Sequence, residues 1–372
     1  MAGRPEVEVA VVGAGLMGAA TAWAATREGL DVTLLERYEV GHARGSSHGS
    51  ARIVRRAYAD RLYVRMTGEA LRLWRELEDD AGTRLLRMTG AADQGVVRAP
   101  ERIAAVLADQ GVPHEVIPAT EAERRWSGLR FEGPVLYHPD AGTVDAAAAV
   151  SAFVERARAR GAEVRERTPV RRIEVLGPEA VRLVTDGGSV TARRAVVAAG
   201  AWAGELLGGL VPLPELTVTQ QQIFHFPPRD RSVTDGWPVL VHDAKLLVYG
   251  LPGGADGGPR GGWKLAEHDA GRRTTARTRD GVVDPAARER ITAYVRDWLP
   301  GLVPEPFNEA TCLYTSAPRD DFVLDRRGPL VVCSPCSGHG AKFAPLIGAW
   351  TAALATGGAA PVDRFRLPST PA

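Results

Sequence analysis

The run Val7-Glu-Val-Ala-Val-Val12 leads directly into Gly13-Ala-Gly-Leu-Met-Gly18, and Ala19–Glu28 continues with residues that favour a helix. Gly29 interrupts this helix, and Asp31–Glu36 has the composition of a second buried strand. Together these residues predict a strand–helix–strand unit. A glycine spacing of G-x-G-x-x-G indicates dinucleotide binding only in this setting, with a strand before the glycines and a helix after them.

Each residue of this motif has a physical task in binding a dinucleotide. Gly13, Gly15 and Gly18 let the backbone approach a pyrophosphate, whose negative charge is stabilised at the N-terminus of the following helix. Glu36, at the end of the second strand, is placed to hydrogen-bond the hydroxyls of the adenosine ribose. A carboxylate there disfavours a 2′-phosphate and therefore NADP. FAD and NAD remain, and the alternative is a tight strand–helix turn without a ligand.

The composition is that of an ordinary globular enzyme. Of the 372 residues, 45% are hydrophobic and 24% charged, and 46 basic residues balance 45 acidic residues to a net charge of +1. This balance does not indicate nucleic acid or an anionic membrane as a partner. No apolar run approaches the roughly 20 residues that cross a bilayer, and the first residues show no signal-peptide pattern. We therefore expect a cytoplasmic enzyme.

Cysteine and lysine are both scarce. The three cysteines, an odd number confined to residues 312–336, argue against a disulfide framework. Only Lys245, Lys264 and Lys342 are lysines, and every other basic side chain that is not histidine is arginine. Each lysine is therefore informative, because arginine does not replace a compact ammonium that can lose its proton.

The pattern of elements changes along the chain. Between about 83 and 143, and again between about 213 and 310, short strand-like runs and turn residues replace the alternation of strands and helices. A helix is expected over Ala146–Arg160, and a buried strand, Ala195–Gly200, meets a glycine. Near the C-terminus, Leu330–Val332 predicts a strand and Lys342–Thr356 a helix. A chain of this length fits two domains, and the pattern predicts that they are interleaved.

Four further segments carry a resemblance to a known family. They are Gly45-Ser-Ser-His-Gly-Ser-Ala-Arg52-Ile-Val-Arg55, Gly262-Trp-Lys-Leu-Ala-Glu-His268, Thr311-Cys-Leu-Tyr-Thr315 and Ser337-Gly-His-Gly-Ala-Lys-Phe343. With the glycine motif, their order and spacing resemble the monomeric sarcosine oxidase and N-methyltryptophan oxidase family from residue 7 to about 365. These are FAD-dependent amine oxidases of the D-amino-acid-oxidase-like superfamily, so the resemblance favours FAD over NAD.

The resemblance also implies a fold. It is an α/β protein with a Rossmann-like FAD-binding domain of the glutathione-reductase type, interleaved with an α+β substrate domain on a mostly antiparallel sheet. The predicted FAD-binding domain consists of residues 1–82, 144–212 and 311–372, and the substrate domain of residues 83–143 and 213–310.

For the flavin, the resemblance implies a thioether between Cys312 and the 8α carbon of FAD; the alternative is a buried free thiol. It places Lys342 near the flavin, where it promotes the reaction with O₂. A fixed positive charge would stabilise the negative charge that develops on oxygen; the alternative is a surface lysine. The N–H groups of Gly338 and Gly340 would face the end of the reduced ring. The predicted cofactor-binding residues are Gly13, Gly15, Gly18, Glu36, Ser46, His48, Arg52, Val170, Gly200, Cys312, Gly338, Gly340 and Lys342.

For the substrate, the resemblance places Arg52 against the flavin and pairs Arg55 with a carboxylate, helped by Lys342. A guanidinium binds a carboxylate through two parallel hydrogen bonds, although surface arginine is the alternative in so arginine-rich a chain. The two arginines would lie on neighbouring positions if this segment were helical. The predicted catalytic residues are Lys342, His268, Arg52 and Tyr249, and the predicted substrate-binding residues are Arg55, Lys342, Tyr314, Tyr249 and His268.

The resulting expectation is an oxidase of the C–N bond of a secondary α-amino acid, N-methyl or cyclic. Hydride passes to flavin N5, an imine forms, and O₂ is reduced to H₂O₂. We expect a monomer and no metal. One alternative is a biosynthetic flavin oxidase or dehydrogenase of a cyclic imino acid or other amine. Another is a non-catalytic redox sensor that uses Cys333 and Cys336, although a C-x-x-C that follows a strand is interpreted here as two buried thiols.

Overall fold

The computed structural model describes residues 5–258 and 262–369. The decisive stretch folds as predicted, into β1 (Val7–Val12), α1 (Leu16–Arg27) and β2 (Val32–Leu35). β1 pairs in parallel with β2 on one side and with β12 (Gly188–Val197) on the other. Because both faces of β1 are covered, its side chains are apolar on both sides, as parallel strands require.

β1 lies inside an eight-stranded sheet. Its path runs β10-β11-β12-β1-β2-β9, and β20 pairs with β12 and with β19. The strands around β1 are parallel, whereas β10, β11 and the β19–β20 hairpin add antiparallel pairs. The remaining strands of this sheet are β9 (Glu163–Arg165), β10 (Val170–Gly177), β11 (Ala180–Thr185), β19 (Val323–Arg327) and β20 (Leu330–Ser334).

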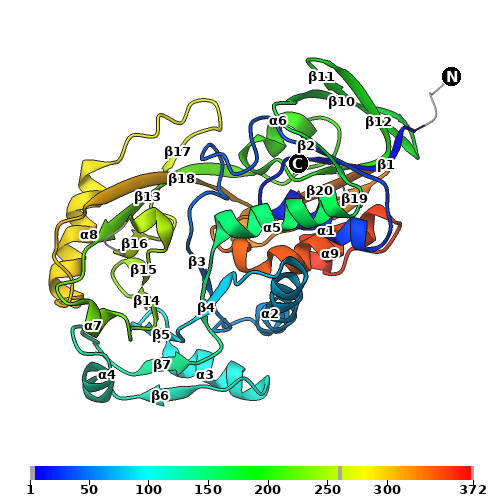
Figure 1. The fold of residues 1–372 in the computed structure, drawn as a ribbon. Coiled ribbons are helices and arrows are strands. Elements are labelled where there is room, and N and C mark those ends of the chain that lie inside the picture. Colours follow the sequence, from blue (N-terminus) through cyan, green and yellow to red (C-terminus); the bar gives the residue numbers. More distant parts are fainter. Residues whose placement is uncertain (1–4, 259–261, 370–372) are drawn as a thin grey trace.

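Helices cover one face of this sheet, where α1 packs between α5 (Ala146–Ala159) and α9 (Ala344–Ala355) (Figure 1). Their apolar side chains join those of α2 (Arg61–Ala81) in one buried cluster that includes Trp23, Trp74 and Phe153. β10, β11 and the short α6 (Ala203–Leu207) contribute to the cluster on the other face. The first turn of α1 is thereby fixed at the carboxyl end of β1, where a dinucleotide fold binds its ligand.

The second large sheet has nine strands in the described part of the chain. Its path runs β17-β13-β16-β15-β14-β5-β7-β6, and β18 pairs with β13. Only the β5–β14 pair is parallel, so the mostly antiparallel sheet is confirmed. Its strands are β5 (Ala91–Gln94), β6 (Glu115–Ile117), β7 (Val135–His138), β13 (Thr217–Phe226), β14 (Val239–Asp243), β15 (Leu247–Pro252), β16 (Trp263–Glu267), β17 (Arg272–Arg273) and β18 (Asn308–Ser316).

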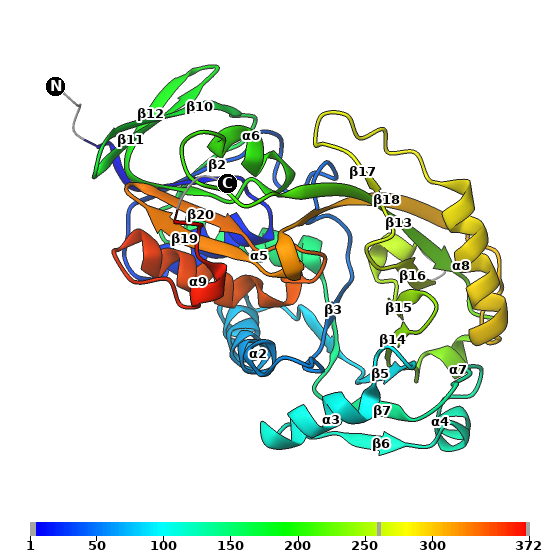
Figure 2. The same cartoon turned by 180° about the vertical axis from the view of Figure 1, so that it is seen from behind.

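A small sheet and several short helices complete the fold. Figures 1 and 2 show β3 crossing between the two large parts of the molecule, and α8 (Pro285–Trp298) on the outside of the nine-stranded sheet. The predicted boundary at residue 311 falls inside β18, which pairs with β13 along its whole length. The small sheet contains β3 (Arg52–Val54), β8 (Gly142–Val144) and β4 (Leu86–Met88), and the other helices are α3 (Pro100–Asp109), α4 (Ala119–Arg125) and α7 (Arg231–Thr234).

Candidate active site

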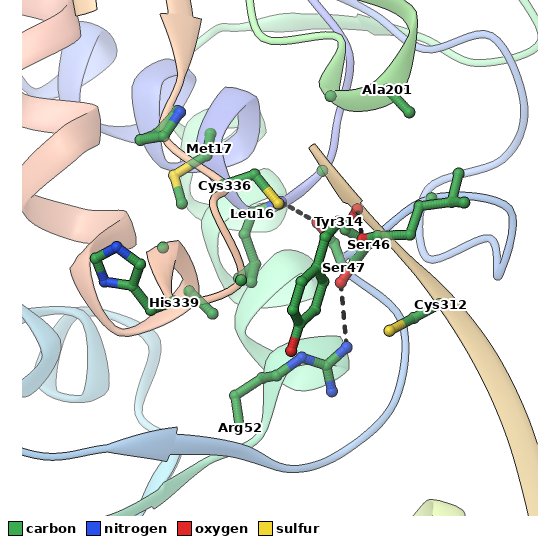
Figure 3. A pocket seen from close by; sticks show the side chains of 18 of the residues that line it. Leu16, Met17, Ser46, Ser47, Arg52, Ala201, Cys312, Tyr314, Cys336 and His339 are labelled. Carbon is green, nitrogen blue, oxygen red and sulfur yellow. Dashed lines mark hydrogen bonds between the residues drawn. The ribbon is translucent and has the colours of Figure 1, made fainter. Parts of the chain in front are cut away.

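A cavity of about 560 Å³ is lined by residues of both large sheets. It begins at the glycine turn after β1 and reaches β15, β16 and β18, so segments far apart in the sequence face the same space (Figure 3). All of the predicted site residues line it except Gly18 and His48. The cavity therefore brings together residues predicted to bind the cofactor and residues predicted to bind the substrate.

The glycine turn is built so that only glycine fits. Gly13 has a φ of +99°, and a Cβ on it would lie 2.7 Å from the carbonyl oxygen of Ala198. A Cβ on Gly15 would lie 2.9 Å from Ser47 Oγ, which accepts a hydrogen bond from Leu16 N at 2.9 Å. Gly18 does not reach the cavity, and a Cβ on it would collide with the carbonyl oxygen of Gly13. The first turn of α1 therefore presents bare backbone to the cavity, as a pyrophosphate requires.

Glu36 is buried beside this turn. Its carboxylate accepts hydrogen bonds from Ala14 N at 2.7 Å and Tyr38 N at 2.9 Å, and His42 Nε2 lies 3.3 Å away. Burial alone would raise the pKa of Glu36, but these hydrogen bonds, led by that of His42, outweigh burial and hold the pKa below its ordinary value. The ionised carboxylate lines the cavity as an acceptor for ribose hydroxyls, so the residues present fit the adenosine half of FAD.

Arg52 lies on β3, and its guanidinium donates to the carbonyl oxygens of Ser46 at 3.1 Å, Ala51 at 2.9 Å and His48. The local helix considered for Arg52 and Arg55 is wrong. Residues Arg52–Val54 pair with β8 as an extended strand, and residues three apart in a strand do not share a face. Both side chains nevertheless line the cavity, because the chain leaves the strand before Arg55.

Cys312 and Tyr314 lie two residues apart on β18 and therefore project to the same side of the strand, into the cavity (Figure 3). Burial raises the pKa of the Cys312 thiol, whereas the nearby charges of Arg52 and Lys264 lower it. Tyr314 Oη is 3.5 Å from Nδ1 of His268, which follows β16. Tyr249, on β15, also lines the cavity, and burial raises its pKa to about 12, so that its hydroxyl stays protonated.

The loop before α9 packs tightly against these side chains. Gly338 has a φ of +70°, and a Cβ on it would lie 2.5 Å from the Tyr314 ring and 2.6 Å from the His268 ring. Burial, with the charges of Arg55 and Lys342, lowers the pKa of His268 to about 4, so this imidazole is neutral near pH 7. Gly338 therefore lets the loop approach two predicted substrate-binding residues.

Lys342 lies in the 3₁₀ turn η4 (Gly340–Phe343), one turn before α9. Its Nζ donates to the carbonyl oxygen of His339 at 2.6 Å and lies 5.7 Å from the centre of the Tyr58 ring. Arg55 lies 4.6 Å over the same ring. Burial, and then the charge of Arg55, hold the pKa of Lys342 well below its ordinary range. Two cations thus share one aromatic ring at this end of the cavity.

Sequence reasoning assigned no role to four basic residues that line the cavity, Arg37, Arg98, Lys264 and Arg319, and two of these bear on the site. Lys264, on β16, is 2% exposed and donates from Nζ to the carbonyl oxygen of Ala51 at 3.1 Å. Burial and the charge of Arg52 lower its pKa to about 8. The scarcity of lysine marked Lys264 as informative, but a role was assigned only to Lys342. Arg98, in the loop after β5, had no signal at all in an arginine-rich chain.

The three cysteines are free thiols. Cys333 is buried on β20, where its Sγ lies 3.5 Å from Thr351 Oγ1, and Cys336 Sγ accepts from Thr315 N at 3.3 Å. The prediction of two buried thiols holds for Cys333, whereas Cys336 is a free thiol that is only half-buried. Cys336 also lines the cavity near Tyr314 (Figure 3).

The whole chain, and with it the cavity, is similar to known flavoproteins. A family profile described as FAD dependent oxidoreductase (DAO) matches residues 8–354, nearly the whole chain. The chain belongs to this family of FAD-dependent oxidoreductases. The human peroxisomal sarcosine oxidase is 33% identical over 91% of this chain and 89% of its own length. The monomeric sarcosine oxidase of Bacillus sp. (strain NS-129) is 30% identical over 94% of this chain and 93% of its own length.

Solved structures agree with these relatives. The open form of NikD, an unusual amino acid oxidase essential for nikkomycin biosynthesis, is 27% identical with a TM-score of 0.87 and covers 98% of both chains. The L-proline dehydrogenase from P. horikoshii shares the fold, with a TM-score of 0.85 at 22% identity over 97% of both chains. The predicted family relationship and fold class are confirmed, and so is an FAD-dependent oxidase of amines or amino acids. Within residues 5–258 and 262–369, no helix has both the length and the apolar character to cross a membrane.

Proposed function

We propose that this FAD-dependent oxidoreductase oxidises the C–N bond of a secondary α-amino acid, N-methyl or cyclic, with O₂ as the electron acceptor. One observation carries the proposal. The glycine turn, the Cys312 thiol and the paired cations Arg55 and Lys342 line a single cavity, so a dinucleotide held at one end reaches an anion-binding end. The sarcosine oxidases among the relatives support the substrate class.

Different residues of the cavity would bind different parts of the cofactor. Gly13, Gly15 and Glu36 suit the pyrophosphate and the adenosine ribose, and Cys312 supplies the thiolate for a covalent link to the 8α carbon. Bound FAD would supply the acceptor for the two electrons of the C–N bond and would pass them to O₂, with release of H₂O₂. We assign further cofactor contacts to Ser46, Arg52, Val170, Gly200, Gly338, Gly340 and Lys342, and none to His48, which does not line the cavity.

Arg55 and Lys342 bind the substrate carboxylate in this proposal. Both basic side chains line the same end of the cavity, and a bound carboxylate would pair with Arg55 and favour the protonated form of Lys342. His268 is neutral near pH 7, so its imidazole can accept a hydrogen bond from the substrate nitrogen. Tyr249 and Tyr314 have hydroxyls in the same cavity, and they would orient the nitrogen.

The reaction with O₂ needs a positive charge that the substrate does not neutralise. Lys342 is the predicted residue, but a carboxylate bound between Arg55 and Lys342 would cancel its charge. Lys264 lies at the Arg52 and Cys312 end, and its pKa of about 8 keeps it mostly protonated at pH 7. We therefore propose that Lys342 binds the substrate carboxylate and that Lys264, instead of Lys342, supplies the positive charge for the reaction with O₂.

The larger organisation is proposed on the same basis. We propose an FAD-binding domain of residues 1–82, 144–212 and 311–372 and a substrate domain of residues 83–143 and 213–310; the two large sheets support this division except at residue 311, which lies inside β18 of the nine-stranded sheet. A monomer is supported by the bacterial relatives named monomeric sarcosine oxidase. The free thiols support a reducing compartment such as the cytoplasm.

The test is anaerobic reduction of the purified holoenzyme. Sarcosine, N-methyl-L-alanine, L-proline and L-pipecolate should bleach the flavin absorbance faster than glycine and L-alanine, and air should restore it with one H₂O₂ per turnover. Bleaching by primary amino acids alone would contradict the substrate class. Bleaching by a cyclic imino acid without rapid recovery in air would favour the dehydrogenase alternative. Arg55→Met should raise KM by roughly tenfold or more, the cost of one lost charge-assisted hydrogen bond.

A further inference from the structure

One end of the cavity is lined by three basic side chains, those of Arg55, Arg98 and Lys342. The buried carboxylate of Asp93 contacts the two arginines. We propose that this end binds two carboxylates of one substrate, and that Arg98 determines this specificity. The substrate is then a secondary amino acid with a second carboxylate, on a short side chain or on the nitrogen. The inference rests on the proposed oxidation of secondary amino acids and narrows its substrate class.

The two guanidinium groups are held unusually close together. Arg55 Nη1 and Arg98 Nη2 both donate to the carbonyl oxygen of Ala57, the latter at 2.9 Å. Asp93 Oδ1 accepts from Arg98 Nε at 2.6 Å and lies 3.9 Å from Arg55 Nη1. One carboxylate therefore serves both arginines, and Lys342 lies against the same Tyr58 ring as Arg55.

The neighbouring histidines do not change the net charge at this end of the cavity. His138 Nε2 accepts a hydrogen bond from Ala57 N at 3.1 Å, so this nitrogen carries no proton, although it lies 4.0 Å from Asp93. Burial lowers the pKa of His138 and of His268 to about 4. Burial likewise holds the pKa of His339 well below its ordinary value. All three rings are neutral near pH 7 and neither add to nor offset the excess positive charge.

The other carboxylates near this end are paired elsewhere or exposed, except Asp243, which is half-buried near Arg98 and whose pKa is raised by burial. Asp60 and Asp321 pair with Arg364, at 2.6 and 3.1 Å, and Asp321 also lies 3.5 Å from Arg319. Asp320 is exposed at the rim, where solvent screens its charge. Arg55 and Arg98 against Asp93 leave an excess of one positive charge, and a carboxylate bound beside Lys342 would favour its protonated form and so add a second. A monocarboxylate would neutralise one of them and a dicarboxylate both, and an uncompensated buried charge is costly.

Hydrogen-bond donors are available for both groups. Among the described residues, Nη1 of Arg98 makes no hydrogen bond, and neither do Nε and Nη2 of Arg55. Lys342 Nζ uses one of its three hydrogens, for His339. A first carboxylate can bind between Arg55 and Lys342, and a second can bind at Arg98. A purely structural Arg98, present only to neutralise Asp93, needs no side chain at the cavity surface.

The test measures binding to the oxidised holoenzyme without turnover. Acetate, propionate, malonate and succinate are titrated while the flavin absorbance is recorded. We expect the dicarboxylates to bind about tenfold or more tightly than the monocarboxylates, the effect of one charge-assisted hydrogen bond. Arg98→Gln should abolish this preference, whereas Arg98→Lys and Arg102→Gln, on the exposed side of α3, should keep it.

Equal binding of both classes, or a preference that survives in Arg98→Gln, overturns the inference. If Arg98→Gln does not fold because Asp93 is left unpaired, the double variant Asp93→Asn/Arg98→Gln removes both charges and gives the same comparison. Turnover separates the two proposals. If the enzyme oxidises sarcosine and shows no higher kcat/KM for iminodiacetate or N-methyl-L-aspartate, the inference about two carboxylates is wrong and the proposed function stands. If the enzyme prefers to bind dicarboxylates but oxidises no secondary amine, the proposed function is wrong and the inference about the binding site stands.

Discussion

Nζ of the buried Lys264, on β16, lies 3.7 Å from Oδ2 of the half-buried Asp256, in the segment that follows β15. Asp256 is fixed in turn by Ser50, whose Oγ accepts from Asp256 N at 2.8 Å and donates to its carboxylate. This relationship holds a positive charge beside Arg52 and Cys312, whereas Lys342 lies beside Arg55. The two lysines of the cavity therefore have different neighbours, and they are expected to do different work.

Substitution of the two lysines should separate these roles. Lys264→Met is expected to slow the recovery of reduced flavin in O₂ by about 10²–10³-fold, the usual effect of losing a preorganised charge, with little change in anaerobic reduction. Lys342→Met is expected to raise KM and to spare the oxygen step. Stopped-flow measurement of each half-reaction checks both. The reverse pattern would return the oxygen role to Lys342, as the sequence predicted.

Asp256 should set the pH range of the oxygen step. Lysine is charged below its pKa, so recovery in O₂ should be fast at low pH and should fall as the pH rises through about 8. Asp256 raises the pKa of Lys264, and Asp256→Asn should therefore move the midpoint to lower pH. Ser50→Ala keeps the carboxylate and removes only the hydrogen bonds that fix it, so it should move the midpoint less than Asp256→Asn does. An unchanged midpoint in Asp256→Asn would show that the ion pair does not tune Lys264.

Acid should destabilise the protein through its buried histidines. Burial lowers the folded-state pKa of His138 from 6.5 to about 4, so its contribution to stability is complete above pH 6.5 and is lost as the pH falls toward 4. His138→Gln keeps an acceptor for Ala57 N and should flatten the loss in this window. One pKa unit corresponds to about 1.4 kcal/mol, so the difference amounts to a few kcal/mol at most.

Urea unfolding of the holoenzyme at several pH values between 7.5 and 4.5 measures this effect. The control variant is His114→Gln, which makes the same substitution at a histidine that is only half-buried. His48, His225 and His268 share the lowered pKa, so the slope should decrease in His138→Gln without vanishing. Parallel curves for wild type and His138→Gln would contradict the prediction.

The sequence predicted the parts of the fold that depend on neighbouring residues. β1, the glycine turn and α1 are contiguous, and the φ of Gly13 and the contacts of Gly15 explain why those positions are glycine. In each case the physical constraint acts within a few residues, so the pattern is visible without the fold.

The features that the sequence did not predict depend on contacts between distant segments. Lys264 reaches Ala51 from β16, 213 positions along the chain, and Arg98 meets Arg55 only through Ala57 and Asp93. The Arg52 segment is extended because β8, some ninety residues later, pairs with it. Local sequence does not encode such partners, and the abundance of arginine hid Arg98 further.

The covalent link is the prediction on which the cofactor assignment can be checked most directly. Cys312 is buried in the cavity, where the charges of Arg52 and Lys264 favour its thiolate and oppose the effect of burial. If it forms a thioether with FAD, acid precipitation should leave the yellow colour with the polypeptide, and the intact mass should exceed the chain mass by one FAD. Cys312→Ser should release the colour into the supernatant and should still bind FAD, because the glycine turn and Glu36 are unchanged.

Cys336→Ser is the matched control, since Cys336 is a second thiol on the same cavity and should leave the link intact. Loss of the link in Cys336→Ser but not in Cys312→Ser would move the attachment to the other thiol. Free FAD from the wild-type protein would remove the covalent claim, while the family assignment and the roles proposed for Arg55 and Lys264 would stand. A wild-type protein that binds no FAD at all would contradict the fit of the glycine turn and Glu36 to the dinucleotide.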